Sequence, residues 1–371
     1  MWHPGVLVLL AVFATALLVC LGLIATQRWH GKLTLDHDLE GIQKIHRRPV
    51  PRIGGVALFI ALLLGGGACW LTDNPRTNQI LTVLACGIPA FLAGLIEDLT
   101  KKVGVRTRLY ASFASAALAI WLLNASLTHL DTPGLNSLVA LAPLSVLFTC
   151  FAVGGLTNAI NIIDGINGLA AGSVVLILAG LGAMAWMHQD LLVLDLCLLG
   201  MAALSGFMLL NFPSGRIFLG DGGAYLSGFW LAECAVLLLA RNPAVSTWAV
   251  LLACVYPVWE TVFSMFRRQV ISRASSGEPD QVHLHHVLLT WLRTHRIRGA
   301  DTRPSWKSHG LVSMAIWIMV VACQIPALGL ADNSALLACG VAAFAGIYCW
   351  IYQSLNSNAD HETESINIAK I

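Results

Sequence analysis

Residues 6–24 read VLVLLAVFATALLVCLGLI, a run of 19 residues without a charged side chain. A helix of about 20 apolar residues crosses the roughly 30 Å hydrocarbon core of a membrane. Ten further apolar blocks of similar length follow between residues 53 and 352, and polar segments separate most of them. Because only helices and closed barrels satisfy their backbone in lipid, this pattern predicts an all-α polytopic membrane protein with about eleven transmembrane helices.

The composition agrees with this fold class. Of the 371 residues, 57% are hydrophobic and 11% are charged, whereas a soluble domain carries about 25% charged residues. We expect residues 1–352 to form a single transmembrane domain and the polar residues 353–371 to form a disordered cytoplasmic tail. The ten cysteines lie in or beside apolar blocks without a CxxC spacing, so we expect them to pack as small hydrophobic residues.

The basic residues lie on one side of the membrane if the N-terminus is placed in the periplasm. Five segments then face the cytoplasm and hold 19 of the 22 Lys and Arg residues, while the outward loops hold only Arg76 and Arg241. The positive-inside rule therefore predicts a periplasmic N-terminus and a cytoplasmic C-terminus. The first block precedes its basic residues, which favours an uncleaved first helix over a signal peptide. The five cytoplasmic segments are 25–52, 97–108, 158–168, 211–223 and 267–309.

The third apolar block, residues 80–96, runs directly into Glu97-Asp98. Two adjacent carboxylates repel each other, so a positive charge must offset them. Lys101 and Lys102 would do so in an ordinary helix-end cluster. A bound Mg²⁺ would do so as well, because it is held by one or two carboxylates together with phosphate oxygens. The residues alone leave both interpretations open.

Residues 158–168 read NAINIIDGING and join two apolar blocks. A tight interhelical turn accounts for Gly165 and Gly168, because glycine tolerates unusual backbone conformations. It accounts less well for Asn158, Asn161 and Asp164, because each polar side chain in a membrane-embedded segment must find a partner. The segment is therefore a candidate for contact with a ligand.

Residues 211–223 read NFPSGRIFLGDGG. Asp221 lies between glycines, so the backbone there can approach a phosphate or a metal closely. Arg216 carries the planar guanidinium that suits phosphate oxygens. Phe218 is either part of the core or a surface on which a nucleobase stacks.

The longest polar segment contains His283-Leu284-His285-His286. Histidines beside a phosphate can donate hydrogen bonds or give a proton to a leaving group. The alternatives are a solvated polar loop and a zinc site, and the absence of a cysteine set disfavours zinc. Downstream basic residues form either a generic membrane-surface patch or a field for anionic lipid or nucleotide. Glu233 and Glu260 lie inside apolar blocks and receive no catalytic role.

Together with Pro51-Arg52-Ile53-Gly54-Gly55, these segments resemble the polyprenyl-phosphate N-acetylhexosamine-1-phosphate transferase family over about residues 45–290. In this chain Leu284 interrupts the three histidines, whereas the peptidoglycan translocase is expected to carry an unbroken histidine triplet. In this feature the chain is more similar to the O-antigen-initiating branch of the family. The resemblance implies that the catalytic residues are Glu97, Asp98, Asp164 and His285. It implies a metal site at Asp221 and Asp98. The substrate-binding residues that it implies are Asn161, Asn211, Arg216, Phe218, His283, His286, Arg47 and Arg48.

By this resemblance, the protein transfers an N-acetylamino-sugar 1-phosphate from a UDP-sugar to undecaprenyl phosphate, releases UMP and starts O-antigen or other surface polysaccharide synthesis. The implied cofactor is Mg²⁺, with Mn²⁺ as the alternative. The implied location is the bacterial inner membrane with the site on its cytoplasmic face. Lipid is an expected partner, nucleic acid is not, and a homodimer stays open. Glu97 and Asn167 replace aspartates that the family usually carries, which leaves their roles open.

Three alternatives stay open at this stage. The first is the phospho-MurNAc-pentapeptide translocase of peptidoglycan synthesis. The second is a transporter of an anionic solute, which the nearly uncharged outward loops disfavour. The third is a membrane scaffold without catalytic activity.

Overall fold

A computed structural model describes residues 5–35, 49–132, 134–272, 282–296, 306–331 and 333–368. Over these ranges the regular structure is helical, and one isolated antiparallel bridge joins Leu35 to Pro51. The predicted all-α class is therefore confirmed. The elements are α1 (Val6–Ala25), α2 (Gln27–Thr34), α3 (Gly54–Leu71), α4 (Thr77–Cys86), α5 (Ile88–Thr100), α6 (Val105–Leu123), α7 (Leu135–Val139), α8 (Ala142–Ile163), α9 (Leu169–Met187), α10 (Leu191–Asn211), α11 (Gly220–Arg241), α12 (Thr247–Ala253), α13 (Val255–Phe266), the π-helical turn η1 (Arg267–Ser272), α14 (Leu284–Arg296), α15 (Trp306–Gly329) and α16 (Ser334–Ile368).

Eight helices in the described ranges are long and apolar enough to cross a membrane, namely α1, α3, α8, α9, α10, α11, α15 and α16. The count rises to ten if each bent pair is one span; α4 and α5 meet at 43°, and α12 and α13 at 77°. The polytopic prediction is confirmed, although these spans number fewer than the eleven expected. The fourth predicted block, residues 109–124, lies on α6, which carries Arg106 and Arg108 in its first turn and is not among these candidate spans.

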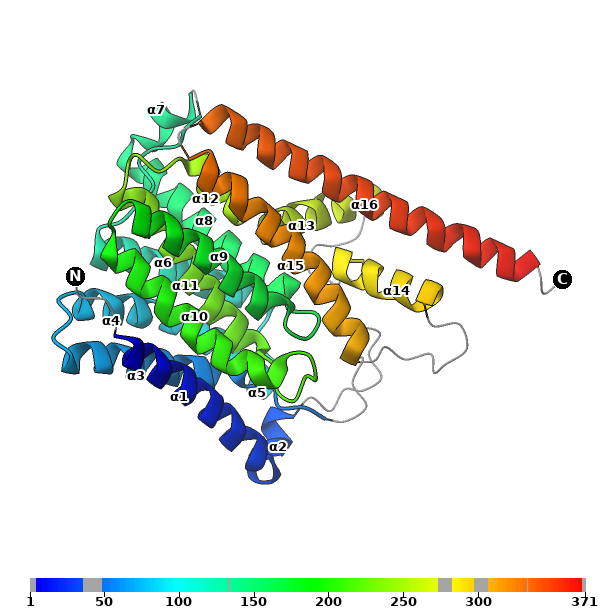
Figure 1. Ribbon diagram of the computed structural model, residues 1–371, viewed down its shortest axis with the longest axis horizontal. Helices are drawn as coiled ribbons and strands as arrows, with labels where there is room; N and C mark the ends of the chain where they lie inside the picture. The colour runs from blue at the N-terminus through cyan, green and yellow to red at the C-terminus, as the bar shows by residue number, and fades with distance from the viewer. Residues whose placement is uncertain are drawn as a thin grey trace.

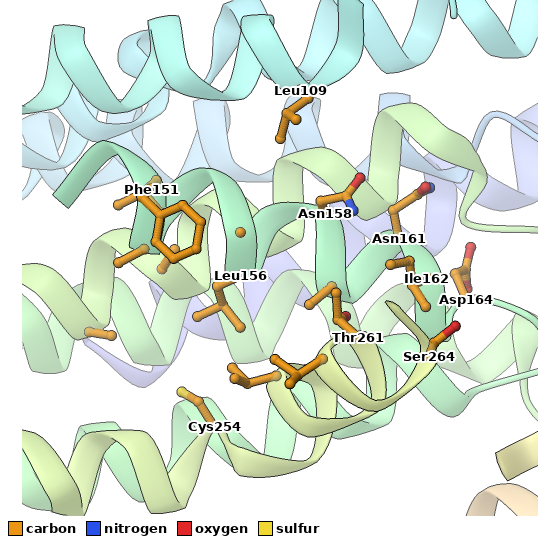
Figure 2. Close-up of a pocket in the computed structure, with 18 of the residues that line it drawn as sticks. Leu109, Phe151, Leu156, Asn158, Asn161, Ile162, Asp164, Cys254, Thr261 and Ser264 are labelled. Atoms are coloured by element: carbon orange, nitrogen blue, oxygen red, sulfur yellow. The ribbon is translucent and has the colours of Figure 1, made fainter. Parts of the chain in front are cut away.

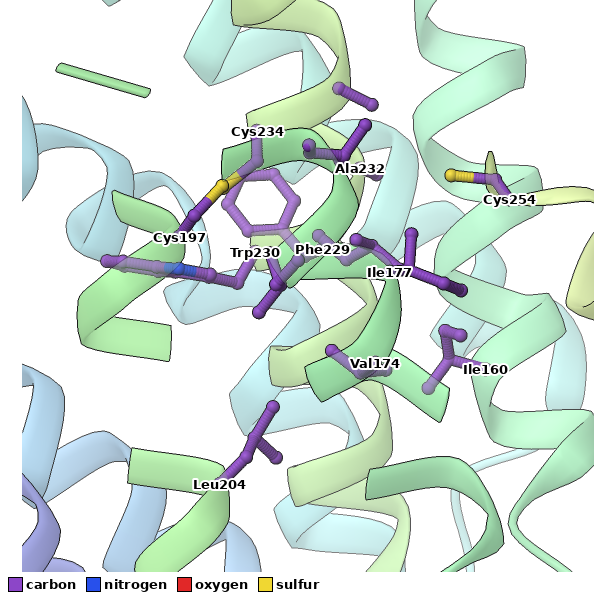
Figure 3. Packing of buried hydrophobic residues seen from close by; sticks show 14 of the residues in the cluster. Ile160, Val174, Ile177, Cys197, Leu204, Phe229, Trp230, Ala232, Cys234 and Cys254 are labelled. Atoms are coloured by element: carbon purple, nitrogen blue, oxygen red, sulfur yellow. The ribbon is translucent and has the colours of Figure 1, made fainter. Parts of the chain in front are cut away.

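Helix α11 is the centre of the bundle (Figure 1). It contacts α3, α5, α6, α8, α9 and α10. Of the residues in its apolar, membrane-spanning stretch, 89% are buried. Figure 3 shows Phe229 and Trp230 of α11 among apolar side chains of neighbouring helices, with Cys197 and Cys234 in the same layer. Seven of the ten cysteines are buried, as expected for small core residues.

Glycines let two neighbouring helices reach the backbone of α11. A Cβ atom on Gly55 of α3 would lie 2.3 Å from the amide nitrogen of Gly223. A Cβ atom on Gly94 of α5 would lie 2.5 Å from the carbonyl oxygen of Asp221. Real Cβ atoms do not approach backbone that closely, so only glycine permits this packing. The first turn of α11 is therefore held between α3 and α5.

The end of the bundle opposite this turn carries the two arginines that the sequence places outward. Arg76 Nε lies 2.8 Å from Asp195 Oδ2, and Arg241 Nε lies 2.7 Å from Asp190 Oδ2. Asp195 lies within α10 and Asp190 caps it. Both cations are therefore neutralised by α10, and a buried charge paired in this way costs far less than an isolated one.

Asp131 joins three segments at the same end. Its Oδ2 accepts hydrogen bonds from the Ser246 hydroxyl (2.6 Å), the Thr247 amide (2.9 Å) and the Ser334 hydroxyl (3.1 Å). Its Oδ1 lies 2.9 Å from His129 Nε2. Burial raises the pKa of Asp131, but these hydrogen bonds outweigh it and hold the pKa below its ordinary value. The carboxylate thus ties α12 and α16 to the segment before α7.

Several predicted loops are partly helical. α5 continues to Thr100, α8 continues to Ile163, and α11 begins at Gly220, so the polar motifs lie on helix ends rather than in open loops. Residues 353–368 of the predicted tail are helical, because α16 continues to Ile368, and the disorder expected of the tail stays a prediction. That segment contains no glycine or proline, so no residue in it breaks the helix.

The substitution Gly55→Ala tests the close packing of α3 on α11. We expect it to lower the midpoint of thermal unfolding in detergent by about 5 °C, because overpacking of this kind costs about 1–3 kcal/mol. The matched control is Gly67→Ala on the same helix, where an added Cβ meets nothing within 4 Å. Equal midpoints for the two variants would contradict this packing.

The substitution Asp131→Asn tests the junction at the opposite end. A carboxyl with a depressed pKa stabilises the fold above its unfolded pKa of about 3.9, and this stabilisation is lost as the pH falls through the folded value. We expect the variant to unfold about 3–6 °C below the native protein at pH 7, because charged hydrogen bonds are lost. This difference should shrink below about pH 4; a difference that persists unchanged to pH 3 would contradict the role of the charge.

Candidate active site

The described parts of the five polar segments expected on one side of the membrane converge at one end of the bundle, which we call the site end. Asp221, in the first turn of α11, lies at the meeting point. Arg52 Nη2 lies 3.3 Å from Asp221 Oδ1, and Asn161 Nδ2 donates to the same oxygen at 3.3 Å. Arg108 forms an ion pair with Asp221 Oδ2. Residues from three distant parts of the chain therefore surround one carboxylate.

Asp98 holds the start of α11 in place. Its Oδ1 accepts a hydrogen bond from the Asp221 amide at 2.9 Å, and its Oδ2 accepts one from the Gly222 amide at 2.8 Å. The first amides of a helix have no intrahelical partner, and the positive end of the helix dipole favours a carboxylate there. The side chain of Asp98 is only 1% exposed. Asp98 therefore caps α11 from α5 and fixes the backbone that carries Asp221.

A cavity of about 1080 Å³ opens beside Asp221. Its polar wall lies at the site end, and Figure 2 shows Asn158, Asn161 and Asp164 there. The remainder is apolar and follows α8 toward the opposite end of the bundle, where Leu130 and Trp248 line it. Further residues of the apolar wall are Leu127, Phe148, Phe151, Leu156, Val258 and Val262.

Asp164 follows the last residue of α8 and lines the cavity. Burial raises its pKa to about 7, with Arg52 opposing the shift and Asp98 adding to it. Desolvation disfavours the charged form of a carboxyl, which is why its pKa rises. Asp164 can therefore take up or release a proton near neutral pH.

The three histidines of the motif form a compact cluster at the start of α14. The rings of His283 and His285 stack at 5.6 Å, and those of His285 and His286 lie 4.1 Å apart. His283 and His286 line the cavity, and His309 joins them from α15. His285 is fully buried against Gly165, and burial together with the other histidines lowers its pKa well below the ordinary value.

The structure brings most of the predicted site residues into one cavity wall and leaves others out. Glu97 is not in the wall, and its carboxylate accepts a hydrogen bond from the Val103 amide at 2.7 Å. Arg216 is exposed outside the wall. Arg47 and Arg48 lie outside the described residues. Asp98 and His285 do not line the cavity. Asp98 is bound to the first amides of α11, and His285 packs against Gly165. The predicted residues that line the cavity are Asn161, Asp164, Asn211, Phe218, Asp221, His283 and His286.

Asn211 lines the cavity, but its amide is already used inside the protein. Its oxygen accepts a hydrogen bond from the Gly168 amide at 2.6 Å, and its nitrogen donates to the Ile217 carbonyl at 2.8 Å. Asn211 therefore joins the segment after α8 to the segment after α10. Phe218 is held through its backbone by Pro51 and Gly54, so its ring remains a candidate for contact with a nucleobase.

Sequence reasoning missed Arg52, Arg108 and His309 as site residues. Arg52 belongs to the motif at residues 51–55, and its position two residues before Gly54 is a usable signal. Arg108 begins an apolar block, and such an arginine is indistinguishable from an interfacial residue until the fold brings it to Asp221. His309 precedes the apolar part of α15, and nothing in its neighbourhood marks it.

The expected Mg²⁺ can be tested against the donor atoms that are present. Mg²⁺ prefers oxygen ligands and is held by one or two carboxylates with substrate phosphates and water. Asp221 offers a carboxylate in the cavity wall with its side chain 14% exposed, whereas both oxygens of Asp98 are used by α11. Among the described residues, no three His, Cys, Asp or Glu side chains form a metal-binding group. Asp221 therefore fits a Mg²⁺ ion whose other ligands are phosphate oxygens of a substrate and water. The metal itself stays a prediction.

Fold and site together define a polytopic helical membrane protein with a cluster of arginine, asparagine, aspartate and histidine side chains at one end of an apolar cavity. The model of glycosyl transferase family 4 matches residues 80–239. A probable undecaprenyl-phosphate N-acetylglucosaminyl 1-phosphate transferase of Bacillus subtilis is 30% identical over 266 residues, covering 70% of this chain and 71% of the relative. The chain belongs to glycosyl transferase family 4, which confirms the resemblance seen in the motifs.

Other relatives carry similar descriptions. The undecaprenyl-phosphate alpha-N-acetylglucosaminyl 1-phosphate transferase of Thermotoga maritima is 28% identical over 67% of this chain and 72% of its own length. The decaprenyl-phosphate N-acetylglucosaminephosphotransferase of Mycobacterium tuberculosis is 28% identical over 68% of each chain.

The substitution Asp98→Asn tests the cap. An asparagine offers one acceptor oxygen to the two amides and removes the charge beside Arg52, so we expect the Asp221 turn to loosen. Loss of a charged hydrogen bond costs about 1.5–3 kcal/mol, so unfolding should begin several degrees lower and any activity of the site should fall at least about tenfold. Asp73→Asn is the control, because Asp73 is exposed at the other end of the bundle. Unchanged stability and activity in Asp98→Asn would show that the cap is dispensable.

Proposed function

We propose that this protein transfers an N-acetylamino-sugar 1-phosphate from a UDP-sugar to undecaprenyl phosphate and releases UMP. One observation carries the proposal: a single cavity combines a cluster suited to phosphate with a long apolar wall suited to a polyprenyl chain. The names of the relatives support a polyprenyl phosphate as acceptor and N-acetylglucosamine as the first sugar to test.

The donor diphosphate fits beside Asp221. Arg52 and Arg108 present guanidinium groups there, and guanidinium forks match phosphate oxygens. Arg108 also lies over the ring of Tyr225 at 5.7 Å, and the Tyr225 hydroxyl donates to Asn158 at 3.0 Å. These contacts fix the direction of Arg108. The two arginines neutralise Asp221 in the free protein and would bind phosphate oxygens when the donor enters.

The lipid acceptor fits the apolar wall. A polyprenyl chain has no polar group along its length, so it needs an apolar surface that begins at the phosphate site. The wall along α8 and the bent α12–α13 pair supplies such a surface. With the phosphate of the lipid at the polar end, its oxygen faces the donor and the two substrates meet without leaving the membrane.

The reaction transfers a phosphoryl group between two phosphates. An oxygen of the lipid phosphate attacks the β-phosphorus of the UDP-sugar, the bond from that phosphorus to the bridging oxygen breaks, and UMP leaves with the electron pair. A Mg²⁺ ion bound by Asp221 and the phosphates would neutralise charge during the transfer. Arg52 and Arg108 stabilise charge on the phosphate oxygens. Asp164, whose pKa is about 7, can accept the remaining proton of the lipid phosphate.

The same proposal covers the location of the enzyme and its product. The basic residues of the chain are concentrated in segments whose described parts lie at the site end, which supports a bacterial inner-membrane enzyme with its site on the cytoplasmic face. UDP-sugars are available on that face. The lipid-linked sugar would start O-antigen or another surface polysaccharide.

A UMP-release assay tests the proposal. The purified protein in detergent is given undecaprenyl phosphate, Mg²⁺ and a panel of UDP-sugars that includes UDP-N-acetylglucosamine and UDP-MurNAc-pentapeptide. We expect release of UMP that requires both the lipid and the metal, with an N-acetylhexosamine donor preferred. Absence of release with every donor, from protein that unfolds cooperatively on heating, would contradict the proposal.

The substitution Asp221→Asn tests the central carboxylate. We expect turnover to fall at least about a thousandfold while the protein remains folded, because the Asp221 carboxylate is paired with both Arg52 and Arg108 at the polar end of the cavity. Asp73→Asn again serves as the matched control and should keep native activity. Near-native UMP release by Asp221→Asn would remove Asp221 from the chemistry.

A further inference from the structure

We propose that the last helix, α16, positions the histidine cluster of the site through Tyr348 and Glu260, so that this membrane helix is part of the catalytic apparatus. The inference rests on the proposed function for its kinetic consequences. The anchoring itself rests on contacts of the described residues. Neither Tyr348 nor Glu260 lies within the part of the chain that the family model matches.

Glu260 of α13 is the link between the membrane helices and the histidines. Its side chain is 1% exposed. Its Oε1 lies 2.9 Å from His283 Nδ1 and also accepts a hydrogen bond from the Leu284 amide at 3.3 Å. A carboxylate at Nδ1 holds the proton on that nitrogen and fixes the orientation of the imidazole ring. Glu260 therefore sets how His283 is presented in the cavity wall.

Tyr348 of α16 in turn holds Glu260. The Tyr348 hydroxyl, which is fully buried, donates to Glu260 Oε2 at 2.7 Å. The two oxygens of the carboxylate thus have different partners, one on the histidine segment and one on α16. A buried carboxylate that loses a donor pays a desolvation penalty and moves toward another partner. The direction of the Glu260 carboxylate therefore depends on α16.

A second contact one helical turn further along α16 acts on the same segment. The Tyr352 hydroxyl donates to the Val282 carbonyl at 3.0 Å, directly before His283. Phe263 of α13 packs edge-on against both tyrosine rings, at 5.2 Å from Tyr348 and 4.8 Å from Tyr352. The two hydroxyls therefore hold the backbone on one side of His283 and, through Glu260, its ring and the amide that follows.

The burial of α16 is consistent with this role. Only 17% of the residues in its apolar, membrane-spanning stretch are buried, so most side chains of this stretch do not pack against the rest of the protein. The buried residues form one narrow stripe, and both tyrosines belong to it. They are Leu337, Phe344, Tyr348 and Tyr352. A helix with so little packing to contribute still places two hydroxyls on the active-site segment.

A double-mutant cycle measures whether Glu260 and Tyr348 act through His283. We expect Glu260→Gln and Tyr348→Phe each to raise the KM for the UDP-sugar about tenfold, because each removes a hydrogen bond of a charged group. The KM for undecaprenyl phosphate should stay within about twofold of the native value. In the His283→Ala background, the same substitutions should have no further effect on kcat/KM. Additive losses, or native kinetics in both single variants, would overturn the proposal.

Matched controls separate this role from general damage. Tyr256→Phe is made on the same helix as Glu260, and its hydroxyl has no hydrogen-bond partner among the described residues. Glu233→Gln changes another buried glutamate, in the middle of α11. Both controls should keep native values of KM. A loss of UDP-sugar affinity in the controls equal to that in Tyr348→Phe would also overturn the proposal.

Hydrogen exchange tests the anchoring without any assay of activity. The Leu284 amide should exchange at least about tenfold faster in Glu260→Gln and Tyr348→Phe than in the native protein, because its hydrogen bond to Glu260 is weakened. Tyr256→Phe should leave the exchange unchanged. Native exchange in Glu260→Gln and Tyr348→Phe would overturn the anchoring. Faster exchange in a protein that releases no UMP would instead contradict the proposed function and leave the anchoring intact.

Discussion

The two hydrogen bonds from the first amides of α11 to the carboxylate of Asp98 are the interaction on which the site depends. Helix α11 is the most enclosed helix of the bundle, so the position of its first turn decides where Asp221 lies. A helix start buried among other helices must find acceptors for its free amides, and Asp98 supplies them from α5. The same carboxylate lies 3.5 Å from Arg52 Nη2. The Asp98 carboxylate therefore both caps α11 and helps to position Arg52 in the cavity wall.

The remaining parts of the site follow from this fixed turn. Glycines at Gly55 and Gly94 allow α3 and α5 to contact the α11 backbone, and this contact brings Arg52 to Asp221. The end of α8 supplies Asn161, and the histidine segment closes the polar wall from the side of α13 and α16. The apolar wall begins where these polar groups end. A phosphate on a long apolar chain is the ligand that such a change of surface suits best.

The sequence was sufficient for the fold class and for much of the cavity wall. Apolar blocks of membrane length predict the helices, and Asn161, Asp164 and Asp221 stand out as polar residues at their ends. The sequence could not show that Glu97 and Asp98, which were both expected in the site, have different surroundings. Glu97 and Asp98 are adjacent in the chain, but the helical turn sends one to the Val103 amide and the other to α11. Neither the hydrophobic periodicity nor the spacing of the motif predicts toward which neighbour each of these two side chains points.

The long-range contacts could not be predicted from the sequence for a related reason. Glu260 and Tyr348 are 88 positions apart. Glu260 stands out in the sequence as an acid inside an apolar block, but nothing there connects it with Tyr348. Only their meeting beside His283 gives them a role. His309 and Arg108 likewise gain meaning from the residues that folding places next to them. The signals that sequence does carry are the glycines, because close approach of two backbones leaves few other choices.

The transfer of the sugar together with its phosphate is the central claim of this account, and the fate of a radioactive β-phosphate in UDP-N-acetylglucosamine tests it most directly. The labelled donor is incubated with the purified protein, undecaprenyl phosphate and Mg²⁺, and the lipid is extracted. The account predicts that the label moves into the lipid fraction in step with the release of unlabelled UMP. Label that stays in UDP while the sugar alone reaches the lipid would contradict it, because the bond broken would then be the glycosidic one.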